Sequence, residues 1–169
     1  MRGLSKKAVD LLDYNGYSYK HKNSIITFRK RFDYIGSIVL ILVVFFVSLI
    51  FFPFGLAFLA LTIIGVIWYR AAVIKNNTLR FDMNINRAYI FDRKILFKHI
   101  SAFYLRSKFV SEYSSSHKST SKEYKVTMSV EFVRGGRYEL FGFVSYYEKP
   151  SKEIEEIHDF LMSVVKESN

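Results

Sequence analysis

Cysteine is missing from this 169-residue sequence, and proline occurs only twice. The absence of cysteine excludes disulfides, thiolate catalysis and cysteine-ligated metal sites together. One of the two prolines, Pro53, lies close to Gly55 in the middle of the longest apolar run. Because proline interrupts the hydrogen-bond ladder of a helix, it divides this run into two parts.

Motifs of the common enzyme chemistries are also missing. The sequence has no P-loop, nucleophile elbow or dinucleotide fingerprint. The four histidines lie far apart: His21, His99, His117 and His158. A zinc site needs three or four convergent ligands, which this spacing does not offer. Gly135-Gly136 between two arginines is explained by a hairpin turn, since no helix follows to complete an anion site. We therefore expect no enzyme, no catalytic residue, no metal and no cofactor.

Charge is absent from Tyr34 to Tyr69, a run of 36 residues without Asp, Glu, Lys or Arg. A membrane-spanning helix needs about 20 apolar residues, so the run with its flanks is nearly long enough for two. We predict two helices, about Phe32–Phe52 and Phe54–Ile74, that cross the membrane as a hairpin. A hairpin that dips into the membrane and returns is an open alternative. A buried helix or hairpin of a soluble domain is disfavoured by length.

Small and hydroxyl-bearing residues recur along both predicted arms, and we expect them to let the arms pack closely. They are Gly36, Gly55, Gly65, Ser37, Ser48 and Thr62. Aromatic residues at one end, Tyr34, Trp68 and Tyr69, suit the membrane interface. No acid lies within the run, which gives no support to ion or proton transport.

Positive charge is concentrated on both sides of this run. Residues 1–34 hold eight basic residues against three acids and residues 70–110 hold nine against two, whereas residues 111–169 have a net charge of −2. Such flanks place both termini in the cytoplasm. They also attract anionic headgroups, and the residues predicted to do so are Arg29, Lys30, Arg31, Arg70, Lys75, Arg93, Lys94 and Lys98. Nucleic acid is not expected as a partner, because these residues crowd against the apolar run instead of spreading over a soluble face.

The remaining sequence predicts an antiparallel α+β domain. A short amphipathic helix is expected over Leu4–Leu12, a hairpin over Tyr17–Arg31 with its turn at Asn23-Ser24, and a second hairpin over Tyr124–Val144. Further strands are expected over Leu79–Ile85, Ala88–Phe91 and Ile95–Val110, with a bend near His99 to Ser101 and turns at Asn86-Arg87 and Asp92 to Lys94. Residues 111–123 are Ser-rich and predicted as a mobile loop.

A terminal helix is predicted with Pro150 in its first turn, and its apolar face consists of Ile154, Ile157, Leu161, Val164 and Val165. Five to seven strands closed by this helix give a PH-like curved sheet or partial barrel.

The domains expected are an N-terminal segment (1–31), a two-helix transmembrane hairpin (32–74) and a β-domain with its C-terminal helix (75–169). Whether the hairpin before the membrane run joins the later sheet is left open.

An apolar hairpin followed by LRFDMNINRAYIF (79–91), KHISAFYL (98–105), a strong β-hairpin and a terminal helix resembles the bacterial PH-like membrane proteins of the YcxB-like kind. The resemblance covers about residues 32–166. It implies a cytoplasmic β-domain held at the membrane, in families whose activity is mostly undefined, and it brings no catalytic residue with it.

The function expected first is that of a small, multi-pass protein of the cell inner membrane, acting as an interaction module or accessory subunit of a larger membrane complex. Its interface candidates are aromatic residues on strands, because exposed aromatics mark interfaces. They are Phe103, Tyr104, Phe109, Phe141, Phe143, Tyr146 and Tyr147. The alternative is recognition of anionic membrane lipid by the basic residues named above.

Overall fold

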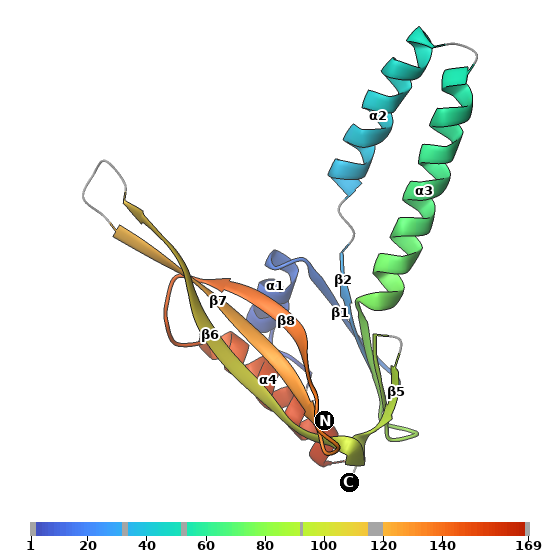
Figure 1. Cartoon of the computed structure of the whole chain (residues 1–169). Helices are drawn as coiled ribbons and strands as arrows, with labels where there is room; N and C mark the ends of the chain where they lie inside the picture. Colours follow the sequence, from blue (N-terminus) through green and yellow to red (C-terminus); the bar gives the residue numbers. More distant parts are fainter. Residues whose placement is uncertain (1–2, 32–33, 52–53, 92, 115–119, 168–169) are drawn as a thin grey trace.

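Two antiparallel sheets and four helices make up the computed structural model, which describes residues 3–31, 34–51, 54–91, 93–114 and 120–167 (Figure 1). The first sheet contains, in sequence order, β1 (Tyr17–Lys22), β2 (Ile25–Lys30), β3 (Thr78–Asp82), β4 (Arg87–Ile90) and β5 (Arg93–Leu96). The second contains β6 (Ile100–Ser114), β7 (Thr120–Phe132) and β8 (Arg137–Ser145). The helices are α1 (Lys6–Tyr14), α2 (Tyr34–Ile50), α3 (Phe54–Asn76) and α4 (Lys152–Lys166), and a 3-10 turn, η1 (Phe97–His99), joins the sheets.

The α+β class with antiparallel sheets and a C-terminal helix is confirmed. The described residues form eight strands in two sheets, instead of five to seven in one curved sheet. The two sheets are separated at η1, close to the predicted bend at His99 to Ser101. The 3-10 turn there ends the pairing of β5 before β6 begins the second sheet.

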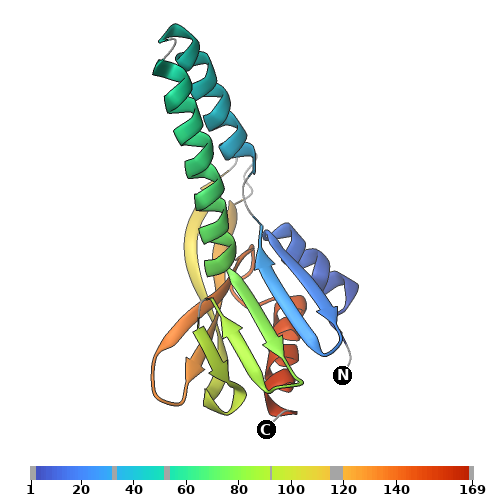
Figure 2. The same ribbon diagram turned by 90° about the vertical axis from the view of Figure 1, so that its right-hand side faces the viewer.

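The two apolar helices are inserted between neighbouring strands of the first sheet. β2 pairs antiparallel with β3, so that Phe28 lies opposite Leu79 and Arg29 lies opposite Thr78. The backbone N–H of Lys30 also donates to the carbonyl of Asn77 at 3.2 Å. Figures 1 and 2 show α2 and α3 projecting from this end of the sheet. The hairpin before the helices therefore does join the later sheet, and residues on both sides of the helices share one core.

Aromatic rings fill the core between the two sheets. Phe28 on β2 meets Phe141 on β8 with ring centroids 5.2 Å apart, and Tyr17 on β1 meets the same ring at 5.1 Å. Phe81 on β3 extends this contact to Phe103 on β6 at 6.5 Å. Strands expose alternate side chains on opposite faces, so each contributes every second residue to this interior. Edge-to-face ring pairs add a favourable geometric term to the burial of their area.

The helix α4 packs against the second sheet through the apolar face that the sequence predicts for this helix. All five residues of its predicted apolar face are buried: Ile154, Ile157, Leu161, Val164 and Val165. The prediction of Pro150 in the first turn is wrong, because the helix begins two residues later, at Lys152. Ser151 is its N-cap and accepts a hydrogen bond from the N–H of Ile154. A serine cap satisfies one of the N–H groups that a helix start leaves unpaired.

Two local predictions are wrong. The predicted loop at 111–123 is mostly strand, because β6 and β7 stay paired as far as Ser114 opposite Thr120, with residues 115–119 outside the described part. The pair extends beyond β8, which ends at Ser145 opposite Tyr124. Among the described residues no third strand pairs with this part of the ribbon, and its polar sequence gives no strand signal. Arg93 and Lys94, predicted as a turn, instead begin β5.

Candidate functional site

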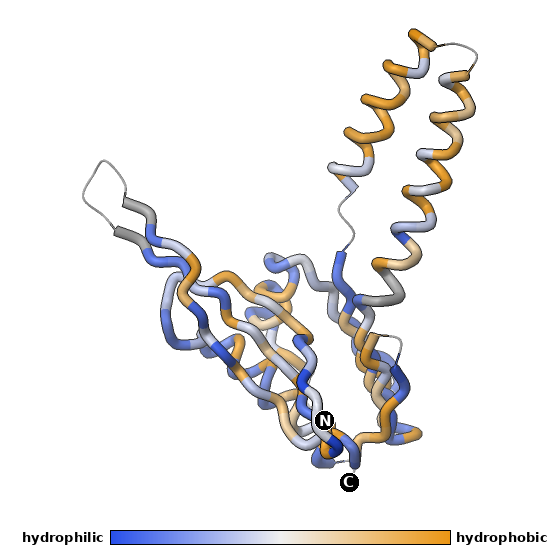
Figure 3. The backbone as a smooth tube through the Cα atoms, in the orientation of Figure 1, coloured by the Kyte–Doolittle hydropathy of each residue, from blue (hydrophilic) through white to orange (hydrophobic). Residues whose placement is uncertain are grey.

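The exposed surface of α2 and α3 is almost wholly apolar (Figure 3). Within α3, residues Phe54–Val73 form a 20-residue stretch of mean hydropathy 2.0, in which Gly55 alone is buried. In the described part of the chain this is the one helix long and apolar enough to cross a membrane, since α2 has 17 residues. Crossing by both arms therefore stays a prediction. The alternative of a buried core helix is wrong, because side chains such as Phe54 are 84 % exposed.

The two helices touch at their loop end. Ser48 of α2 is only 2 % exposed, and a Cβ atom added to Gly55 of α3 would lie 2.6 Å from the Cα of Ser48. Real Cβ atoms do not approach backbone so closely, so this contact requires glycine. Half-way along α3, a Cβ atom added to Gly65 would meet no atom within 4 Å. The prediction that small residues let the two helices pack closely is thus confirmed at Ser48 and Gly55, but it is wrong at Gly65.

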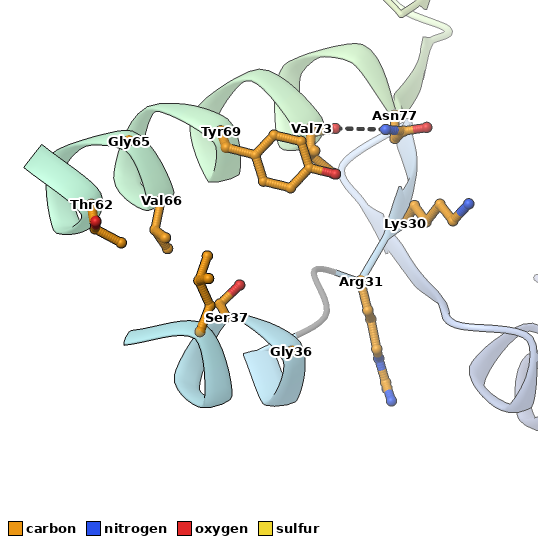
Figure 4. Close-up of a pocket in the computed structure, with 11 residues that line it drawn as sticks. Lys30, Arg31, Gly36, Ser37, Thr62, Gly65, Val66, Tyr69, Val73 and Asn77 are labelled. Atoms are coloured by element: carbon orange, nitrogen blue, oxygen red, sulfur yellow. Dashed lines mark hydrogen bonds between the residues drawn. The ribbon is translucent and has the colours of Figure 1, made fainter. Parts of the chain in front are cut away.

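An open groove lies between α2 and α3 at the end of the helix pair next to the sheet (Figure 4). Its volume is about 680 Å³, and it is lined by Lys30, Arg31, Gly36, Ser37, Leu40, Thr62, Gly65, Val66, Tyr69, Val73 and Asn77. In Figure 4, Val66 and Tyr69 on α3 face Ser37 on α2 across the gap, and Lys30 and Arg31 lie at the sheet end. We call this space the inter-helix groove. Its walls are mainly apolar and its mouth is basic.

A second recess of about 390 Å³ adjoins this mouth, and we call it the basic recess. Its lining residues are Ser18, Lys20, Arg29, Lys30, Arg31, Tyr34 and Arg70. Lys30 and Arg31 line both spaces, so the recess and the groove lie next to each other. No acid is among the described residues lining the recess, although Arg31 forms an ion pair with Asp13 beside it. The Arg70 guanidinium lies 5.2 Å from the centre of the Tyr34 ring, where a cation is attracted by the ring face.

The turn after α1 holds this region together. The backbone N–H of Arg31 donates to the carbonyl of Gly16 at 2.6 Å. The neighbouring Asn15 accepts a hydrogen bond from the N–H of Val144 on β8 at 3.0 Å through its side-chain oxygen. The start of the helical hairpin is therefore connected to both sheets through one turn.

Four of the eight basic residues predicted from the sequence converge here: Arg29, Lys30, Arg31 and Arg70. Lys20 was missed. Its signal is the hairpin register, because Ser18 pairs with Arg29 and Lys20 lies two residues further on the same face.

The other four predicted basic residues do not join this group. Arg93 stacks on the ring of Tyr138 at 4.7 Å and donates to its hydroxyl, and Lys94 lies 6.0 Å from the ring of Tyr89. Lys98 is in η1, at the end of the sheet away from the helices (Figure 1). The side chain of Lys75 is outside the described residues.

The aromatic interface candidates divide into two sets. Phe103, Phe141 and Phe143 are core residues, so their prediction as interface residues is wrong. Their rings are used to join the two sheets, which explains the high aromatic content without a partner.

The remaining four candidates are partly or largely exposed. The Tyr104 hydroxyl donates to the Glu131 carboxylate at 2.9 Å, and this hydrogen bond raises the pKa of Tyr104 above its ordinary value. Phe109 packs edge-on against Tyr124 at 5.8 Å. Tyr146 and Tyr147, which follow β8, are the most exposed of the set.

No family model, no curated protein and no solved structure matches the chain. The resemblance to the bacterial PH-like membrane proteins therefore stays a prediction.

Proposed function

We propose that this protein is a non-catalytic, integral membrane protein that recognises anionic phospholipid where its helical hairpin meets the sheet domain. The observation that carries the proposal is the convergence of Lys20, Arg29, Lys30, Arg31 and Arg70 directly below an exposed apolar helix pair. Each basic residue close to an anionic membrane surface contributes about 1 kcal/mol of attraction. Several within one recess bind more selectively than the same number dispersed over the domain.

The orientation in the membrane follows from the same arrangement. With α3 embedded in the hydrocarbon layer, Tyr34, Tyr69 and Arg70 lie at the end where α3 approaches the sheet. Aromatic and arginine side chains suit the interface between hydrocarbon and water. The sheet domain, which contains both termini, then faces the cytoplasm of a cell with an anionic inner membrane. A PH-like membrane protein is the closest description of this proposed arrangement.

Reversing three charges of the basic recess tests the proposal. We expect a variant with Arg29→Glu, Lys30→Glu and Arg70→Glu to lose its preference for anionic lipid, because attraction becomes repulsion. Trp68 is the one tryptophan of the chain and lies two residues from Arg70, so its energy transfer to labelled lipid reports the local lipid composition. The measurement compares transfer to labelled phosphatidylglycerol and to labelled phosphatidylcholine in mixed vesicles.

The matched control is Lys22→Glu, Lys98→Glu and Arg134→Glu. It changes the net charge equally, but these residues lie in or beside turns at the end of the sheets away from the helices. We expect its lipid preference to equal that of the wild type. A recess variant that inserts normally and still prefers phosphatidylglycerol would contradict the proposal.

A second candidate function, an interaction module or accessory subunit, is supported by exposed tyrosines on two segments that are joined by a hydrogen bond. Tyr14, Tyr146 and Tyr147 are exposed, and the hydrogen bond between Asn15 and Val144 links the two segments that carry them. Tyr147 is 75 % exposed. Exposed tyrosines are enriched at protein interfaces.

Placing a photoreactive amino acid at position 147 separates this function from lipid recognition alone. On irradiation in native membranes, an accessory subunit is expected to give one protein adduct of constant mass. The same substitution at Val133, which is exposed in the turn between β7 and β8, is expected to give none. Lipid adducts alone at position 147 would remove the second candidate.

A further inference from the structure

We infer that the inter-helix groove binds one acyl chain of an anionic phospholipid whose phosphate lies in the basic recess. This inference rests on the proposed function and adds to it a defined, stoichiometric lipid site. The proposed function needs only an enriched layer of anionic lipid around the protein. The inference requires a single molecule held by both its parts.

The first step is that the groove has to be filled. Contact between Ser48 and Gly55 fixes the loop end, while the space at Gly65 stays open. An empty space between helices in hydrocarbon leaves its lining atoms without dispersion contacts. The groove volume of about 680 Å³ is within the range of ordinary ligand pockets. A flexible acyl chain is the component of a bilayer that fits a narrow apolar groove open along its side.

The second step concerns charge at the mouth. The groove ends at Lys30 and Arg31, and Lys30 also lines the basic recess. One molecule with an apolar tail and an anionic end can therefore occupy both spaces at once. The hydroxyl-bearing residues Ser37 and Tyr69 lie between the apolar wall and these cations, at the level of the ester groups of a phospholipid. A zwitterionic lipid can fill the groove as well, but its own cation offsets the attraction between its phosphate and the basic residues of the mouth.

The third step compares another occupant, a helix from a second copy of the chain. Such a copy brings its own Arg29, Lys30, Arg31 and Arg70 toward the same mouth. Like charges placed together across an interface oppose association. An anionic lipid neutralises the same group instead, so the charge of the mouth favours lipid.

The test uses the full chain, purified in mild detergent after equilibration with phosphatidylglycerol or phosphatidylcholine of identical chains. Native mass spectrometry measures the lipid retained per protein. We expect one phosphatidylglycerol per wild-type chain and about tenfold less phosphatidylcholine, a difference of about 1.4 kcal/mol, because the choline cation of phosphatidylcholine offsets its phosphate and is repelled by the basic recess.

Filling the groove should remove the bound lipid. A Gly65→Leu substitution places a side chain where an added Cβ meets nothing, so it occupies the groove without displacing a helix. We expect retained phosphatidylglycerol to fall about tenfold or more. The matched control, Ala60→Leu, adds a side chain of the same kind to an exposed position of α3 outside the groove lining, and should retain lipid as the wild type does.

Trp68 energy transfer makes the two failures distinguishable. Loss of retained lipid in Gly65→Leu with an unchanged preference for anionic lipid in vesicles supports the inference. Unchanged retention in Gly65→Leu overturns the inference and leaves the proposed function in place. A wild-type protein that shows no preference for anionic lipid in vesicles would contradict both the inference and the proposed function.

A second measurement needs no variant. Phosphatidylglycerol with a photoreactive group on its acyl chain should crosslink to Leu40 and Val66 in the wild type in preference to Phe58, which is exposed outside the groove lining. Even labelling over both helices would overturn the inference.

Discussion

Replacing Phe28 with alanine is expected to lower the free energy of unfolding of the sheet domain by about 3–5 kcal/mol. The side chain is fully buried, and its ring contacts those of Tyr19 at 5.3 Å, Phe141 at 5.2 Å and Phe81 at 6.4 Å. Alanine leaves a cavity at the point where the two sheets meet, and the surrounding rings collapse into it only in part.

The measurement is denaturant unfolding of the full chain in detergent, followed by near-ultraviolet circular dichroism of the aromatic core. Phe109→Ala is the control, since this ring is 49 % exposed and packs mainly against Tyr124. We expect the control to lose less than about 1.5 kcal/mol. Equal losses in both variants would contradict the assignment of Phe28 to the centre of the core.

Replacing Gly55 with valine is expected to separate α2 from α3 at their loop end. The added Cβ atom would lie 2.6 Å from the Cα and 2.7 Å from the carbonyl carbon of Ser48. Because backbone atoms cannot rotate away as a side chain can, the helices have to move apart by about 1–2 Å or more. The loss of this contact also removes the best-packed part of the helix pair.

Spin labels measure this separation directly, and the absence of native cysteine makes two labelled positions unique. Val43→Cys on α2 and Leu61→Cys on α3 are exposed sites for the labels. Gly65→Val is the control, since its Cβ atom meets no neighbour within 4 Å. We expect a longer and broader distance distribution for Gly55→Val and an unchanged one for Gly65→Val. The opposite result would show that the helices do not touch at Ser48.

Elements with a regular apolar pattern were predictable from the sequence. The hairpin over Tyr124–Val144 and the helix α4 have one buried face each, so their side chains alternate or recur with the expected period. The end of the β6–β7 ribbon has a polar, Ser-rich sequence without alternating apolar residues and therefore no such signal. The recurrence of apolar residues along the sequence reflects burial, so it predicts a helix or strand only where one face of that element is buried.

The topology was not predictable because its decisive contact is long-range. Nothing local marks Phe28 as the partner of Leu79, since the two helices separate them in the chain. The same pairing determines which basic residues share the recess. Arg29 and Arg70 were identified by their nearness to the apolar run, whereas the inclusion of Lys20 and the separation of Lys98 depend on strand register and direction. Composition likewise cannot distinguish the core ring of Phe141 from the exposed ring of Tyr147.

The insertion of the helical hairpin between β2 and β3 determines an order of events during biosynthesis. As the chain emerges, β1 and β2 form a hairpin that has no further neighbour until β3 follows α3. A two-stranded hairpin is only marginally stable alone in water. The sheet is therefore completed only after both apolar helices have been synthesised. In the membrane arrangement proposed above, a chain whose second helix fails to return to the starting side leaves β2 as an unpaired edge that is exposed to aggregation and proteolysis.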